Sequence, residues 1–175
     1  MAGPIEIDVW QGEIAELEVD ALVVSANESL FMTTGAAASV KRHGGEEIER
    51  DAIDQGPTES GTAIVTRAGS LAATYIIHAV GVGHDRRPDR DQLAAAIRTA
   101  LGFCEPLQLR RVAFSLIGVE HGTFPASDAA AVLVDSVVAT AAGRDLPEAI
   151  IIATANAAET RAVINALAAR RAHVT

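Results

Sequence analysis

The chain has 175 residues, enough for one domain with a sizeable hydrophobic core and too few for two comfortable ones. Its formal net charge is −9, from 23 acidic and 14 basic residues, which disfavours binding to long nucleic acid because neutralising phosphates takes clustered Lys and Arg. The 49% hydrophobic content includes no apolar run of the ~20 residues that a membrane span needs.

The cysteine and histidine residues indicate the cellular compartment of the protein and whether it binds a metal. The single cysteine, Cys104, has no partner for an internal disulfide, and the first residues lack signal-peptide features, so we expect a cytoplasmic protein. We also expect a monomer. The five histidines show no metal-ligand spacing, and we expect neither a metal site nor a cofactor. His78 lies between apolar residues of an expected strand, which is typical of a buried structural histidine. Alanine richness with one lysine, Lys41, suggests a bacterial source.

Apolar patterns predict strands and helices that alternate along the chain. The first strand alternates with period two, as in a half-buried strand, and most later ones are continuous apolar runs, as in strands buried on both faces. In chain order we expect strands at 5–10 and 21–24, a helical region at 35–55, strands at 62–66 and 75–80, a helix at 92–104, a strand at 112–117, a helix from about 125 to 142 capped by Ser127 or Asp128, a strand at 149–153 and a helix at 157–170. We find no repeat, linker or boundary, so we expect one domain over residues 1–175, an α/β protein built as a three-layer α/β/α sandwich.

Two loops form the expected binding site. In sheets of this kind, ligands bind beyond the carboxyl ends of the strands, where loops lead into helix N-termini. The loops after Val24 and after Ile117 have this placement. Backbone amides at a helix N-terminus bind an anion without any net positive charge, so the residues alone predict a pocket for a small anionic ligand.

The same loops resemble those of one known family. Residues 11–14 and 19–27 read QGEI and VDALVVSAN, similar to the opening of a macrodomain, which usually reads QGDI and then VDAIVNAAN. Residues 30–40 resemble the family's glycine-rich loop and first long helix. Residues 61–66 and 75–81 resemble its two central strands, and residues 113–125 resemble its second ligand loop. The resemblance covers roughly residues 5–170 and implies a mixed central sheet within the sandwich.

The resemblance also implies a ligand and a reaction. Macrodomains bind ADP-ribose, and many hydrolyse it from mono-ADP-ribosylated macromolecules without a metal. Asn27 matches the family's asparagine that holds the distal ribose, and the two loops would hold the diphosphate through backbone amides. The expected ligand-binding residues are Glu13, Ile14, Thr33, Thr34, Gly35, Ala36, Gly118, Val119, Gly122 and Phe124, and the expected catalytic residues are Asn27, Glu120 and His121.

Several positions depart from the family's pattern. Val24 replaces the first asparagine of NAAN, and Thr33 and Thr34 replace two glycines. Ala37 stands where some hydrolases of the family carry an aspartate that orients the attacking water. Glu120 stands where a glycine commonly approaches a phosphate. Either Glu120 and its neighbour His121 face solvent on the loop crest, or one of them lies near the distal ribose and supplies the general base that Ala37 cannot.

The adenine end of the expected site also differs. The family's aspartate that accepts from the adenine amino group is Glu13 here, one methylene longer, and the aromatic that often stacks on adenine is absent from residues 153–156. Phe124 matches an aromatic that lies against the distal ribose. Three functions therefore stay open. The leading one is an ADP-ribosyl hydrolase, the second is a reader that binds ADP-ribose or a related nucleotide without turnover, and the third is a macrodomain-like protein that has lost ADP-ribose binding.

Overall fold

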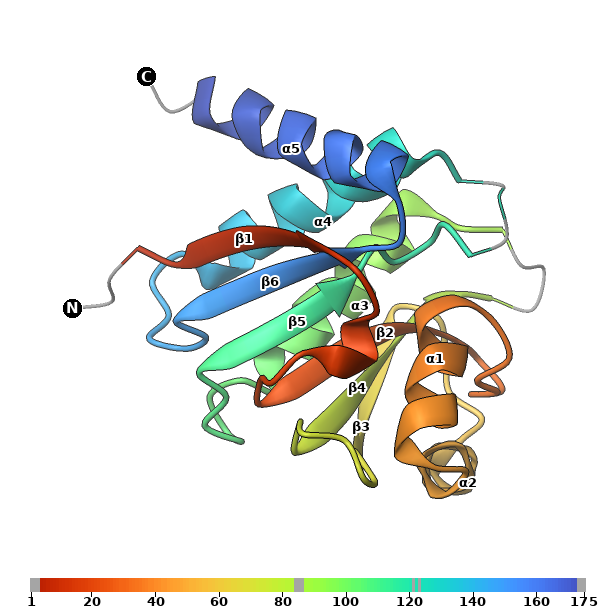
Figure 1. Cartoon of the computed structure of the whole chain (residues 1–175). Coiled ribbons are helices and arrows are strands. Elements are labelled where there is room, and N and C mark those ends of the chain that lie inside the picture. Colours follow the sequence, from red (N-terminus) through yellow and green to blue (C-terminus); the bar gives the residue numbers. More distant parts are fainter. Residues whose placement is uncertain (1–3, 84–86, 121, 123, 173–175) are drawn as a thin grey trace.

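The structure is a computed structural model that describes residues 4–83, 87–120, 122 and 124–172 (Figure 1). Strands and helices alternate along most of the chain. The strands are β1 (Glu6–Gln11), β2 (Ala21–Asn27), β3 (Thr62–Arg67), β4 (Tyr75–Val82), β5 (Arg111–Ser115) and β6 (Ala149–Thr154), and the helices are η1 (Ile14–Glu16, a 3-10 turn), α1 (Gly35–Gly44), α2 (Glu47–Gln55), α3 (Arg90–Gly102), α4 (Ala126–Ala141) and α5 (Ala157–Ala172). Within the described residues, none of the helices is long and apolar enough to cross a membrane.

The strands form one mixed, six-stranded sheet in the order β1-β6-β5-β2-β4-β3. Every neighbouring pair is parallel except β3 and β4, which are antiparallel. Strands β2 and β5 are therefore adjacent at the centre of the sheet, although β3, β4 and three helices lie between them in sequence. Their carboxyl ends, with the loops that follow, meet at one edge of the sheet.

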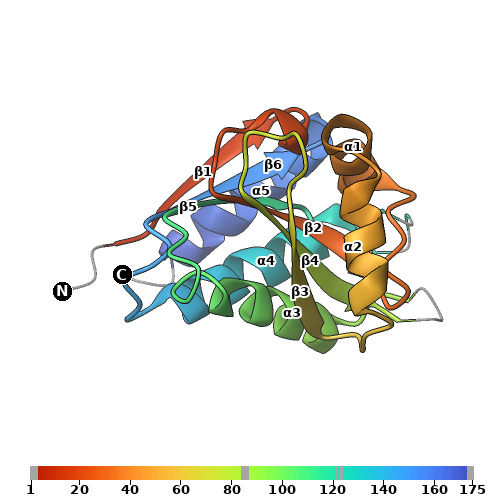
Figure 2. The same cartoon turned by 90° about the horizontal axis from the view of Figure 1, so that it is seen from below.

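Helices cover both faces of the sheet, which gives the expected three-layer arrangement (Figures 1 and 2). Alternation along β2 shows how the sequence produces it. Ala21 and Val23 pack in the core beneath α3, α4 and α5, whereas Leu22 and Val24 pack in the second core beneath η1, α1 and α2. All four side chains are fully buried, as a continuous apolar run predicts for a strand covered on both sides. The predicted fold class is confirmed.

Some element boundaries differ from the predictions. The expected helical region at 35–55 is two helices, because Gly45 adopts a φ of +119° between them. Strand β2 continues three residues beyond Val24, and β5 ends at Ser115, two residues before its expected end. The predicted caps Ser127 and Asp128 are wrong: Pro125 occupies the N-cap of α4, and its carbonyl accepts the first helical hydrogen bonds.

His78 lies fully buried on β4, between β2 and β3. Its Nε2 shares a hydrogen bond of 2.9 Å with the Thr66 hydroxyl, while its Nδ1 lacks a partner among the described residues. Burial lowers the pKa of His78 to about 4, because the protonated ring loses its hydration. The histidine is a structural residue in the core, as its sequence context predicts.

Candidate ligand-binding site

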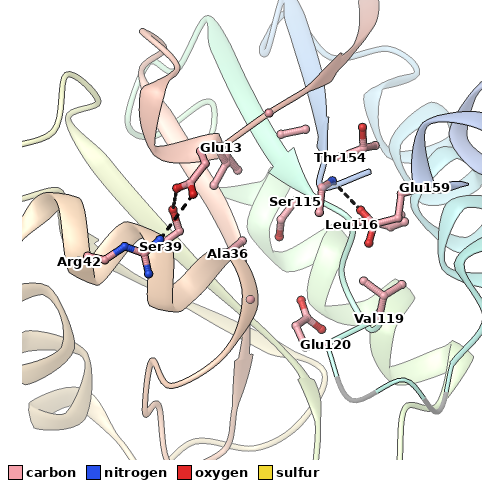
Figure 3. A pocket seen from close by; sticks show the side chains of 15 residues that line it. Glu13, Ala36, Ser39, Arg42, Ser115, Leu116, Val119, Glu120, Thr154 and Glu159 are labelled. Atoms are coloured by element: carbon pink, nitrogen blue, oxygen red, sulfur yellow. Dashed lines mark hydrogen bonds and ion pairs between the residues drawn. The ribbon is translucent and has the colours of Figure 1, made fainter. Parts of the chain in front are cut away.

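A cavity of about 460 Å³ opens beyond the carboxyl ends of β1, β5 and β6 (Figure 3). The first turns of α1 and α5 close two of its sides. A volume of this size suits a nucleotide-sized small molecule. The cavity is lined by Gly12, Glu13, Ile14, Gly35, Ala36, Ser39, Arg42, Ser115, Leu116, Val119, Glu120, Ala153, Thr154, Ala155 and Glu159.

One end of the cavity is marked by Glu13, whose carboxylate is held in place by α1 (Figure 3). The Ser39 hydroxyl donates to it, and Arg42 Nη2 and His43 Nδ1 lie 3.5 and 3.7 Å from its oxygens. The Ser39 hydrogen bond, helped by the charges of Arg42 and His43, lowers the pKa of Glu13. The Glu13 side chain therefore presents an ionised, acceptor-only group at the cavity rim.

Small hydroxyl side chains lie at the strand ends between the two ends of the cavity. Thr154, the last residue of β6, shares a hydrogen bond of 2.7 Å with Thr160. Ser115, the last residue of β5, is buried, and its hydroxyl lacks a hydrogen-bond partner among the described residues. Leu116 and Ala153 add apolar surface to this wall, and Glu159 borders it with a carboxylate that accepts from the Ala155 N–H at 2.8 Å. A flat ligand group between these strand ends would meet both apolar surface and hydroxyl groups.

Glu120 stands at the other end of the cavity, between the two loops (Figure 3). Its Oε2 accepts a hydrogen bond of 3.2 Å from the Gly118 N–H, and the Ser25 hydroxyl also donates to the carboxylate. Burial raises the pKa of Glu120, and the charge of Glu159 acts in the same direction. The interpretation of Glu120 as a solvent-facing residue is wrong, because loop closure turns it inward against α1.

Asn27 lies behind Glu120, in a separate small hollow of about 20 Å³ that Glu120 also lines. The Asn27 side chain is bonded to its own loop: Nδ2 donates to the Phe31 carbonyl at 3.3 Å, and Oδ1 accepts from the Ser29 N–H at 3.0 Å. Ala37 also lines the hollow and is buried. Glu120 therefore divides the main cavity from the hollow that contains Asn27.

The remaining sequence-predicted residues take different places. Ile14, Gly35, Ala36 and Val119 line the cavity, and Thr34 lines the hollow. Thr33, Gly118, Gly122 and Phe124 line neither: Thr33 and Gly122 are exposed, and Phe124 packs beside Gly118 with the Arg90 guanidinium 6.0 Å from its ring centroid. His121 lies outside the described residues.

Sequence reasoning missed several residues of the site. Ser39 and Arg42 project from one side of α1 towards Glu13, and Ser115, Thr154 and Glu159 come from strand ends and the start of α5. The i, i+3 spacing of Ser39 and Arg42, which puts both on one side of a helix, was the only sign of this site in the sequence. It can be interpreted only when Glu13, 26 residues before Ser39, is known to face that side.

The chain matches the family model described as Macro domain over residues 23–133. An uncharacterised protein of Aquifex aeolicus is 34% identical over 134 residues, which cover 76% of this chain and 81% of that protein. A macro domain-containing protein of Cupriavidus necator is 35% identical over 140 residues, covering 75% and 79% of the two chains. An uncharacterised protein of Mycobacterium tuberculosis is 34% identical over 133 residues, and there the match spans only 37% of the relative's length.

Solved structures share the whole fold. The Oceanobacillus iheyensis macrodomain with ADP superposes with a TM-score of 0.86 at 20% identity, over 99% of this chain and 97% of that one. The Trypanosoma brucei macrodomain in complex with ADP-ribose superposes with a TM-score of 0.84 at 19% identity, over 93% of this chain and 69% of that one. At these identities the likeness establishes the fold.

Proposed function

The chain belongs to the macro domain family, and from that premise we propose that its cavity binds ADP-ribose and that the protein hydrolyses ADP-ribose from mono-ADP-ribosylated macromolecules. One observation carries the proposal. The cavity is bounded by an anchored acceptor carboxylate at one end and by a helix N-terminus at the other, which suits a ligand with an amino-bearing base and a diphosphate. Structures of relatives with ADP and with ADP-ribose support the choice of ligand.

Glu13 is proposed to receive the exocyclic amino group of adenine. Its carboxylate is ionised and can only accept, so it matches an N–H donor and opposes a carbonyl at the same place. Ser39 and Arg42 hold it in orientation, so little side-chain freedom is lost when the base binds. The apolar wall between Ile14, Leu116 and Ala153 would then cover the base.

The diphosphate is proposed to lie at the N-terminus of α1. Thr34 occupies the N-cap and makes no side-chain capping bond, which leaves the amides of Gly35 and Ala36 for a ligand. Val119 faces them from the loop after β5. Glu120 partly fills this place, so its carboxylate has to move or take up a proton when the diphosphate enters.

Hydrolysis is proposed to occur where the cavity meets the hollow. Asn27 would hold hydroxyls of the distal ribose, and Glu120 would take a proton from water as the water oxygen bonds to C1″. The bond from C1″ to the acceptor breaks in the same step, and the proton passes from Glu120 to the leaving acceptor. Burial raises the pKa of Glu120, which suits a group that both takes and returns a proton. We propose His121 as a second candidate for this role.

The decisive experiment combines turnover with binding. The protein is incubated with a mono-ADP-ribosylated target while ADP-ribose release is followed, and ADP-ribose affinity is measured in parallel by calorimetry. Binding with release supports the hydrolase. Calorimetry without a binding signal would refute both the hydrolase and the reader, and would leave the protein that has lost ADP-ribose binding.

A non-catalytic reader is the second candidate, and the hollow favours it. Ala37 lies there instead of an acid, and the Asn27 amide is already bonded to Phe31 and Ser29. A reader would bind ADP-ribose in the calorimetric experiment and release none from the modified target.

A further inference from the structure

Phe31 is exposed in a way that the hydrophobic effect alone does not favour. Its side chain is 53% exposed, while its neighbours Leu30 and Met32 are each 1% exposed. Among the large hydrophobic side chains of the described residues, only Phe31 and Ile164 are exposed. Singly exposed apolar residues are common, so exposure by itself decides nothing, and the backbone around Phe31 has to be considered.

The backbone holds Phe31 outward on both sides. Leu30 has a φ of +63°, a left-handed conformation that is unfavourable for leucine, and its N–H donates to the Asn27 carbonyl at 3.0 Å. The Phe31 carbonyl accepts from Asn27 Nδ2. The Met32 N–H donates to Glu49 Oε2 at 2.6 Å. The buried Leu30 in a strained turn and the hydrogen bonds on either side of Phe31 together fix the direction in which the Phe31 side chain leaves the backbone.

Phe31 lies at the hollow that contains Asn27. Phe31, Thr34 and Glu120 line this hollow together with Asn27. Under the proposed function, the bond between the distal ribose and its acceptor would lie where the cavity meets this hollow. An exposed aromatic ring at this point is placed to meet what is attached to ADP-ribose, and it does not line the cavity proposed for the nucleotide.

We propose that Phe31 is a specificity-determining residue that contacts the acceptor polypeptide of a mono-ADP-ribosylated protein. The Phe31 ring would pack against an apolar side chain of the acceptor, next to its modified residue. This inference rests on the proposed function. A polypeptide is favoured over a nucleic acid because the chain carries a net charge of −9, which opposes binding to a phosphate backbone. The same charge favours an acceptor segment with basic residues.

The test compares a modified peptide with free ADP-ribose. The peptide carries ADP-ribose through a non-hydrolysable linkage, with a leucine beside the modified residue and a flanking arginine, and both affinities are measured by calorimetry. Phe31→Ala is expected to weaken peptide binding about 5- to 10-fold and to leave the affinity for free ADP-ribose within about twofold. Phe31→Tyr retains an aromatic ring and is expected to bind the peptide as the wild type does.

Ile164→Ala is the matched control, because Ile164 is the other exposed large hydrophobic side chain and lies on α5. It is expected to change neither affinity. Equal losses for peptide and free ligand in Phe31→Ala would place Phe31 in the nucleotide site, and unchanged peptide binding would remove its role; either result overturns the inference. Preference of the wild type for an ADP-ribosylated oligonucleotide of equal length would overturn the polypeptide assignment. A wild type that binds free ADP-ribose too weakly to measure would instead refute the proposed function, and the inference with it.

Discussion

Glu120 packs directly against Gly35, so that a Cβ on residue 35 would lie 2.8 Å from Glu120 Cγ. Gly35 is the first residue of α1 and Glu120 lies in the loop after β5, and their contact closes the space between the cavity and the Asn27 hollow. Gly35 also has a φ of +57°, so both the backbone conformation and the neighbouring side chain require glycine.

The contact predicts that the effects of Gly35→Ala and Glu120→Ala on the free energy of unfolding are not additive. Gly35→Ala alone is expected to destabilise the fold by about 2 kcal/mol, from left-handed strain and from the clash with Glu120. In the Glu120→Ala background the clash is removed, and a cost of about 1 kcal/mol from the strain should remain. Urea unfolding of both single variants and the double variant measures the coupling. Additive costs would contradict the contact.

Glu120→Gln is expected to change binding and turnover in opposite directions. Removing the carboxylate from the proposed diphosphate site should tighten ADP-ribose binding about 5- to 10-fold. Removing the proposed base should lower the rate of release by about 100-fold. Calorimetry and single-turnover release measure the two effects. A variant with weaker binding and wild-type turnover would assign Glu120 a different role, and the nearby Glu159→Gln serves as a comparison.

Asn27→Ala is expected to lower hydrolysis by about 100-fold, because the distal ribose loses the amide that would orient it. Full activity in this variant would contradict the assignment of Asn27. Since Asn27 also bonds to Phe31 and Ser29, circular dichroism and a thermal melt are needed to show an intact fold. Asn165→Ala, an exposed asparagine on α5, is the control and should retain full activity.

Glu13 is expected to distinguish adenine from hypoxanthine. The inosine analogue of ADP-ribose carries a carbonyl in place of the amino group, and it should bind the wild type at least about 10-fold more weakly. Glu13→Gln can donate to that carbonyl through its amide, so the difference between the two ligands should shrink. An unchanged ratio in Glu13→Gln would show that Glu13 does not read the base.

His78 predicts how stability depends on pH. Its pKa is about 4 in the folded chain, against about 6.5 in the unfolded chain, so below pH 6.5 the unfolded chain binds the proton first. The stability that the neutral, buried His78 contributes is fully present above pH 6.5 and is lost as the pH falls towards 4. The loss in the free energy of unfolding amounts to about 2 kcal/mol at pH 5.

Urea unfolding at pH 7.5 and pH 5 measures this change in the free energy of unfolding. His78→Gln cannot titrate, so the difference between the two pH values should shrink by about the same amount. Proton NMR of the imidazole offers a check that does not depend on the stability of the variant: a His78 resonance that titrates near pH 6.5 in the folded protein would contradict the prediction.

Much of the fold is predictable because its central strands are buried on both faces. The runs at 21–24 and 149–153 contain almost only apolar residues, and in short runs between turn residues this pattern is typical of a strand covered by helices on both sides. Prediction failed at the ends of the strands. Ser25, Ala26 and Asn27 continue β2 by pairing with β4, but their side chains border open space, so no apolar periodicity marks them.

The site was predictable only in part. Loop position and family resemblance point to Glu13, Gly35 and Glu120, and these do line the cavity. Whether Glu120 faces solvent or the interior depends on its contact with Gly35, across 85 residues, and sequence spacing does not contain that information. The inward position of Glu120 also explains how a glutamate fits where the family commonly has a glycine: its carboxylate accepts hydrogen bonds from the Gly118 N–H and the Ser25 hydroxyl.

The cavity wall draws residues from Gly12 near one terminus to Glu159 near the other. Loss of either flanking segment would dismantle the wall, so a ligand that fills the cavity binds only the complete fold. Such a ligand, at about 100 times its dissociation constant, would add about 2.7 kcal/mol to the free energy of unfolding. The melting temperature would then rise by about 5 to 10 °C. The lifetime of this protein against proteases would consequently follow the concentration of its ligand.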